Sequence, residues 1–200
     1  MRFYNIFFSP TGGTEKVADI VAKGTKLDAE EIDLIKEPNK LMKVKFEKKD
    51  LCLVAVPSYG GRIPSVATDM FRKVKADGTK AILVAVFGNR MIDDTLLELQ
   101  DVLEASGFVC IAGMEAVAEH SLMHQFGTGR PDQQDAGICR KDYAKQRSTK
   151  DTCISGKQTI SRIWWCSTQT CCKWKMHFLR SVRKRMPGRC HSVGQSEDDR

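Results

Sequence analysis

Two unbroken apolar stretches do most to limit how this chain can fold. Residues 51–56 are Leu-Cys-Leu-Val-Ala-Val, and residues 81–87 are Ala-Ile-Leu-Val-Ala-Val-Phe. Successive side chains of a strand point to opposite faces of its sheet. A strand that is apolar at every position is therefore buried on both faces, which is typical of the centre of a parallel sheet covered by helices on each side. Both stretches are far shorter than the roughly 20 residues that a membrane-spanning helix needs.

The rest of residues 1–135 alternates between strand-like and helix-like segments. Short apolar runs closed by turn residues indicate strands, and apolar residues at helical spacing indicate helices. A lysine-rich stretch at 36–49 is expected to be a solvated connection. The order predicts an α/β domain with a doubly wound, five-stranded parallel sheet, whose ligand would bind beyond the carboxyl ends of the strands. The expected strands are 3–8, 29–34, 51–56, 81–87 and 108–114, and the expected helices are 14–26, 64–75 and 91–106.

The loop after the first strand has the composition of a phosphate site. It is short, rich in hydroxyl groups and glycine, and it opens a helix, so that backbone N–H groups and hydroxyls converge on an anion. It contains no lysine, unlike the nucleoside-triphosphate P-loop, and no Gly-x-Gly-x-x-Gly. The alternative is that Ser9 and Thr14 only cap the helix. The candidate phosphate residues are Ser9, Thr11, Gly12, Gly13 and Thr14, with Pro10 between the first two.

Two further loops follow apolar strands and should lie at the same edge of the sheet. The second loop contains an aromatic residue, Tyr59, whose alternative role is that of a surface turn residue. Arg62 and Arg90 are either solvated or face an anionic ligand or an electron donor. The candidate residues of the second loop are Pro57, Ser58, Tyr59, Gly60 and Gly61, and those of the third are Phe87, Gly88, Asn89 and Arg90.

A fourth segment, residues 118–132, follows the last expected strand and contains Glu-His-Ser and Phe-Gly-Thr-Gly-Arg-Pro-Asp. Together the four segments resemble the flavodoxin family, in the branch whose flavodoxin domain is fused to a C-terminal 4Fe-4S ferredoxin module. The resemblance covers residues 2–135. It implies a flavodoxin-like fold, FMN as cofactor with its phosphate in the first loop, and Tyr59 stacked on the flavin ring. It also implies backbone contacts to the ring edge from Gly60, Gly61, Gly88 and Asn89.

The function that the resemblance implies is electron transfer between redox partners, such as a ferredoxin or a reductase. No catalytic acid, base or nucleophile is expected, and His120 and His124 are interpreted as loop residues rather than metal ligands. One alternative is an FMN-dependent NAD(P)H:acceptor oxidoreductase. The other is a non-functional truncated product. With no signal peptide or membrane span in the sequence, a cytoplasmic protein is expected, with neither membrane nor nucleic acid as a partner.

Composition changes abruptly after Asp135. Residues 136–200 carry 15 Lys and Arg against 5 Asp and Glu, a net charge of +10, whereas residues 1–135 have a net charge of −3. Six of the eight cysteines lie in the second part, without zinc-ligand spacing. The basic character of the whole chain therefore belongs to the tail. Residues 136–200 are expected to be disordered or poorly packed, to bind no metal, and to lack the last helix of the fold.

The genetic code offers an explanation for this tail. Read one nucleotide later, the codons for Met176-His177 and for Met186-Pro187 each give cysteine. Leu179-Arg180 and Val182-Arg183 permit cysteine, and Pro187-Gly188 permits proline. The result is Cys-x2-Cys-x2-Cys-x3-Cys-Pro, the spacing that ligates a four-iron cluster. The tail is therefore interpreted as an out-of-frame peptide that begins near Asp135, whose in-frame parent would carry the 4Fe-4S cluster.

Overall fold

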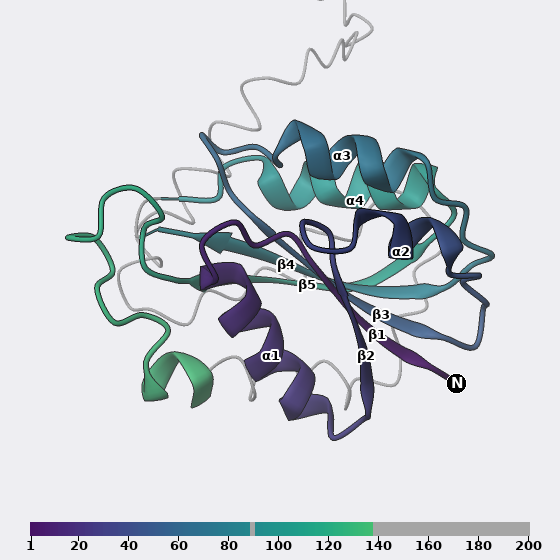
Figure 1. The fold of residues 1–200 in the computed structure, drawn as a ribbon, viewed down its shortest axis with the longest axis horizontal. Helices are drawn as coiled ribbons and strands as arrows, with labels where there is room; N and C mark the ends of the chain where they lie inside the picture. The colour runs from purple at the N-terminus through teal and green to yellow at the C-terminus, as the bar shows by residue number, and fades with distance from the viewer. Residues whose placement is uncertain (89–90, 138–200) are drawn as a thin grey trace, which may run out of the picture. The chain divides into compact units, whose positions relative to one another are not determined.

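The computed structural model describes residues 1–88 and 91–137, and Figure 1 shows a sheet with helices on both of its faces. All strand pairs are parallel, in the order β2-β1-β3-β4-β5. The predicted α/β class and doubly wound five-stranded sheet are confirmed. The strands are β1 Phe3–Phe7, β2 Ala29–Asp33, β3 Leu51–Pro57, β4 Lys80–Phe87 and β5 Val109–Val117; the helices are α1 Gly13–Thr25, α2 Pro38–Lys43, α3 Ser65–Arg72 and α4 Thr95–Ala105.

Each face of the sheet has its own apolar core. In β1, Phe3 and Phe7 point to the face that α1 covers, while Tyr4 and Ile6 point to the face of α2, α3 and α4. The side chains of β3 and β4 alternate in the same way and are buried on both sides. The unbroken apolar stretches of the sequence therefore lie where the physical argument placed them, at the centre of the sheet.

The lysine-rich stretch at 36–49 is more than a solvated connection. It contains α2, and the side chains of Leu41 and Phe46 are buried in the core. The ring of Phe46 lies 5.3 Å from each of the rings of Tyr4 and Phe108, measured between centroids. The prediction for this stretch was wrong because two apolar residues among many lysines are too few to form a helical period.

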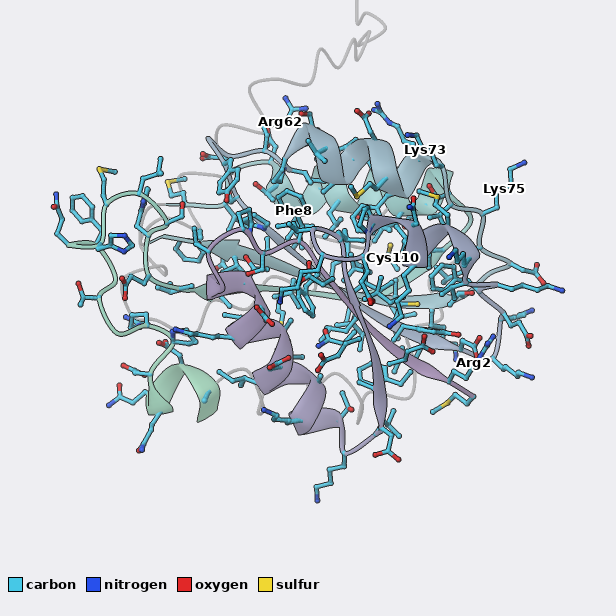
Figure 2. All side chains as sticks on the ribbon, in the orientation of Figure 1. Arg2, Phe8, Arg62, Lys73, Lys75 and Cys110 are labelled. Atoms are coloured by element: carbon cyan, nitrogen blue, oxygen red, sulfur yellow. The ribbon has the colours of Figure 1, made fainter. Side chains whose placement is uncertain are left out.

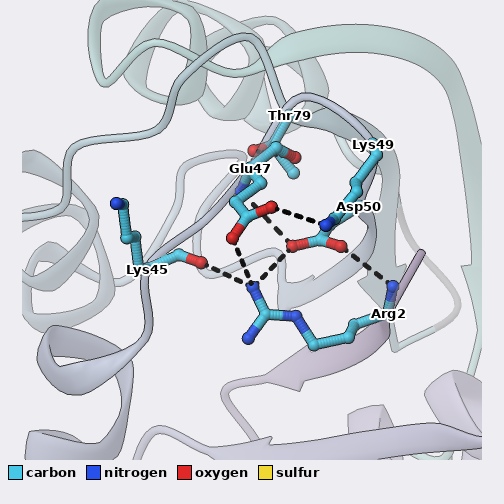
Figure 3. A network of polar contacts seen from close by, with 6 residues as sticks. All are labelled: Arg2, Lys45, Glu47, Lys49, Asp50 and Thr79. Carbon is cyan, nitrogen blue, oxygen red and sulfur yellow. Dashed lines mark hydrogen bonds and ion pairs between the residues drawn. The ribbon is translucent and has the colours of Figure 1, made fainter.

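A buried carboxylate ties together the segments that lead into β1 and β3 (Figure 3). Asp50 is 1% exposed. It accepts hydrogen bonds from the backbone N–H of Arg2 at 2.9 Å, from the Arg2 guanidinium at 2.9 Å and from the backbone N–H of Glu47 at 3.3 Å. Burial alone would raise the pKa of Asp50, but these hydrogen bonds together hold it below its usual range.

Several expectations concern parts of the chain that lie outside the described residues. They are the disordered or poorly packed tail without metal and the out-of-frame origin of residues beyond 137. The missing last helix falls there only in part, because residues 133–137 are helical and the N–H of Ala136 donates to the carbonyl of Asp132 at 3.0 Å. The proposed domain boundary at Asp135 stays a prediction. Within the described ranges, no helix is both long and apolar enough to cross a membrane.

Candidate functional site

Four loops meet at the carboxyl edge of the sheet, because β1, β3, β4 and β5 run in the same direction. The chain passes from β1 to β2 on one side, whereas β3 pairs with β1 on the other side. The loops after β1 and β3 therefore diverge, and such a switch point opens a crevice for ligands. The first two predicted loops flank this switch point.

The loop after β1 is held in shape by its own residues. The backbone N–H of Glu15 donates to the Ser9 hydroxyl oxygen at 2.9 Å, so Ser9 does cap the first turn of α1. Gly12 has φ 81°, a left-handed conformation that favours glycine, and open space surrounds the position of a Cβ there. The glycine is thus required by the backbone turn, not by a neighbouring side chain.

The amide groups of this loop have no acceptor in the described part of the chain. The four N–H groups of residues 11–14 make no hydrogen bond there, and neither does the Thr14 hydroxyl, although the residue as a whole is only 4% exposed. The first amides of a helix carry partial positive charge. Unpaired amides beside an unpaired hydroxyl form a set of donors that fits an anion, and the hydrogen bond that Ser9 accepts leaves this set free.

The loop after β3 makes a tight turn from Tyr59 to Arg62. The N–H of Tyr59 donates to the carbonyl of Arg62 at 2.9 Å, and the N–H of Arg62 donates back at 3.2 Å. The two central residues, Gly60 and Gly61, have φ of 60° and 81°, as a type I′ turn requires. A Cβ on Gly61 would lie 2.6 Å from the Cβ of Asp93, so this glycine also permits a close approach.

The Arg62 side chain is paired with a carboxylate of another element. Its guanidinium donates two hydrogen bonds to the carboxylate of Glu98 on α4, at 2.9 and 2.8 Å, and the N–H of Ile63 donates to the same carboxylate at 3.0 Å. This bidentate contact holds the pKa of Glu98 below its usual range. The sequence left the role of Arg62 open, and the structure makes it an anchor of the turn.

The side chains of Ser58 and Tyr59 differ in their surroundings. The Ser58 hydroxyl lies 2.8 Å from that of Thr95 at the start of α4, and the Ser58 N–H donates to the carbonyl of Val86 at 2.7 Å. Tyr59 is 43% exposed, and no ring contact to it is found within the described ranges. Pro57 is buried at the end of β3. The loop after β3 is thus held by hydrogen bonds of its backbone and of Ser58, and it leaves the ring of Tyr59 partly exposed.

The loop after β4 is described in part. Phe87 and Gly88 are half-buried, while Asn89 and Arg90 lie outside the described residues. The carbonyl of Phe87 accepts the N–H of Ala118 at 3.0 Å. A Cβ on Gly88 would lie 2.8–2.9 Å from atoms of His120. Sequence reasoning missed this contact, because it joins loops that are about 30 positions apart.

The segment after β5 is organised by its histidines and carboxylates. Nδ1 of His120 accepts the N–H groups of Leu122 and Met123 at 3.1 Å each. The ring of His124 lies 2.8 Å from Glu119, whose carboxylate also accepts the N–H of Gly129 at 3.2 Å. Arg130 pairs with Asp135. Within the part of the chain that is described, no group of three or more metal-ligating side chains occurs.

Comparisons with known proteins identify relatives only at the level of structure. No protein-family model and no curated protein matches the chain. A short-chain flavodoxin associated with a non-canonical PDU bacterial microcompartment is 16% identical, with a TM-score of 0.51 over 73% of this chain and 96% of its own. A flavodoxin from the domain Archaea is 11% identical, with a TM-score of 0.50 over 73% of this chain and 98% of its own. Residues 1–137 thus form an α/β domain with the flavodoxin-like fold.

Proposed function

We propose that the chain is an electron-transfer flavoprotein that binds FMN at the carboxyl edge of its sheet. The observation that carries this proposal is the unpaired donor set of the loop after β1, at the switch point between β1 and β3. A phosphate needs several N–H and O–H donors and gains from the dipole of the helix behind them. Ser9, Thr11, Gly12, Gly13 and Thr14 would hold the FMN phosphate.

The same proposal assigns the flavin ring to the loops after β3 and β4. The exposed ring of Tyr59 offers a flat apolar surface for stacking, and the locked turn beneath it fixes the orientation of that surface. Backbone groups of Gly60, Gly61, Gly88 and Asn89 would bond the ring edge. Pro57, Ser58, Phe87 and Arg90 complete the walls of the proposed site.

FMN would supply the electron chemistry, accepting and releasing one or two electrons. The residues of this chain then have three tasks: they hold the phosphate, support one face of the ring, and limit the access of water to it. No proton-transferring side chain is needed for these tasks. We therefore favour an electron carrier over an enzyme with its own substrate, and we propose redox proteins such as a ferredoxin or a reductase as partners.

A flavin titration tests this function directly. The purified chain should quench the fluorescence of added FMN in a saturable way with a stoichiometry near one, and bind riboflavin, which has no phosphate, more weakly. Absence of saturable FMN binding would contradict the proposal and favour a non-functional product. Rapid oxidation of NADH or NADPH by the FMN-loaded chain would favour the oxidoreductase instead.

We also propose that residues after about Asp135 are encoded out of frame, and that the in-frame parent carries a ferredoxin module. The support is the cysteine spacing that appears when the implied codons are read one nucleotide later, together with the change in charge at the same point. Sequencing the gene across codons 130–140, in independent clones, tests the proposal. If every clone repeats the nucleotide sequence that encodes the printed chain, a sequencing error is ruled out. An inherited frameshift would still be compatible with that result.

A further inference from the structure

A Lys-Val-Lys tripeptide occurs twice in the described chain, at residues 43–45 and at residues 73–75. The first copy begins at the last residue of α2, and the second directly follows α3. The valine of each copy packs against the core, whereas all four lysines are exposed. The two copies thus present the same pattern, an apolar residue turned inward between two ammonium groups turned outward.

The fold places the two copies side by side. Phe46 and Ala76, the residues after each copy, form a parallel β-bridge, and the N–H of Asp77 donates to the carbonyl of Phe46 at 3.4 Å. The two segments line a hollow of about 340 Å³ that is open to solvent. Its lining residues are Leu41, Met42, Lys43, Val44, Lys45, Lys73, Val74 and Lys75.

No acidic residue lines this hollow, and none of its four lysines forms an ion pair within the described part of the chain. Other lysines of the same region differ in this respect. Lys40 pairs with Glu37 at 3.4 Å, and Lys49 pairs with Glu47 at 3.0 Å. In Figure 3 the side chain of Lys45 extends away from Glu47 and Asp50, and only its carbonyl oxygen contacts Arg2.

Four uncompensated positive charges around one hollow repel one another, as like charges on adjacent strands do. An anion in the hollow would remove the repulsion. We propose that this hollow binds an anion with several negative charges of the polyphosphate type, either free or as the phosphate chain of a nucleotide.

The hollow is separate from the proposed flavin site. Its segments lead into the amino ends of β3 and β4, whereas the candidate flavin loops leave the carboxyl ends. Figure 2 shows this separation along α3, with Arg62 near one end of the helix and Lys73 and Lys75 near the other. Anion binding here therefore does not depend on FMN, and its test is independent of the electron-transfer proposal.

Calorimetric titration of the full chain with sodium tripolyphosphate, at an ionic strength held constant with NaCl, tests this inference. The test variant is Lys45→Gln with Lys75→Gln, which removes one charge from each tripeptide and leaves a flexible polar side chain at both positions. The control is Lys23→Gln with Lys26→Gln, at the end of α1, which changes the net charge equally. The basic tail is the same in all three proteins, so any anion that it binds is common to them and the comparison between the variants isolates the hollow.

The test variant should lose about tenfold or more in affinity for tripolyphosphate, while the control variant keeps the affinity of the unaltered chain. In the absence of the anion, the test variant should melt no lower than the unaltered chain, since the repulsion has been reduced. Equal affinity for ATP and tripolyphosphate indicates the phosphate chain as the ligand, and tighter binding of ATP indicates a nucleotide. Equal losses in both variants, unchanged affinity in the test variant, or equally tight binding of citrate would overturn the inference.

Discussion

Thr14 is the residue whose surroundings say most about the proposed flavin site, because its hydroxyl has no hydrogen-bond partner among the described residues. Replacing it by valine keeps the side-chain shape and removes the O–H donor. A lost hydrogen bond to a charged group costs roughly 1.5–3 kcal/mol, so FMN should bind about 10- to 100-fold more weakly. Fluorescence titration with FMN and with riboflavin measures this, and riboflavin affinity should change much less.

The matched control for Thr14→Val is Thr68→Val, at another buried threonine in α3. This control should leave the affinity for both flavins unchanged. Equal losses of FMN and riboflavin affinity in Thr14→Val would mean that the hydroxyl supports the fold of the loop and does not contact the phosphate.

Tyr59 is the second residue with a specific expectation. A tyrosine stacked on a flavin quenches its fluorescence, so Tyr59→Ala should raise the fluorescence of bound FMN and weaken binding. Tyr59→Phe keeps the flat ring and serves as the control. Steady-state fluorescence of the saturated proteins distinguishes the two variants, and an alanine variant indistinguishable from the unaltered chain would place Tyr59 outside the site.

At the scale of elements, the segments before β1 and β3 depend on one carboxylate, Asp50. Its pKa is lower in the folded chain than the usual value near 3.8 that applies when unfolded. Its ionised form therefore stabilises the fold above that usual value, and this contribution is lost as the pH falls through the lower folded pKa. Urea unfolding between pH 7 and pH 3 should show decreasing stability over the acid part of the range.

Asp50→Asn should lower the free energy of unfolding at pH 7 by about 1–3 kcal/mol, because an amide cannot accept all three hydrogen bonds. It should also flatten the acid part of the pH profile. Asp101→Asn, at an exposed position on α4, is the control and should reproduce the profile of the unaltered chain. Parallel profiles for Asp50→Asn and the unaltered chain would show that Asp50 does not contribute in this way.

Predictions from the sequence were correct where a local residue pattern is compatible with few structural environments. Fully apolar stretches can only be central strands of a covered parallel sheet, so β3 and β4 were predictable. Gly60 and Gly61 marked a turn because two positive φ angles in succession exclude most side chains. The partner of Arg62 was not predictable, because Glu98 lies on another element and any of several carboxylates would satisfy the same guanidinium. The two Lys-Val-Lys copies line a shared hollow because Phe46 and Ala76, the residues after them, form a β-bridge, and the sequence does not indicate this pairing.

At the scale of the whole molecule, the frame proposal makes the sharpest claim. Removing one nucleotide near codon 135 should yield a soluble brown protein with both flavin and iron–sulfur absorption, because the cluster ligands are then encoded.

For the chain as it stands, hydrogen exchange should be slow in β1, β3 and β4 and fast in residues 136–200. Slow exchange through to Arg200 would show the tail to be real structure and the frame proposal to be wrong.

The contact between Gly88 and His120 has a consequence for how the chain could have evolved. A Cβ at position 88 would lie 2.8 to 2.9 Å from Cδ2, Cα and Cβ of His120. Because one of these atoms belongs to the backbone, a smaller side chain at position 120 would not make room for that Cβ. The close approach is thus one of backbone to backbone, and it restricts position 88 whatever residue stands at 120. Homologous sequences should therefore keep glycine at 88 while position 120 varies, unless one of the two loops has changed its path.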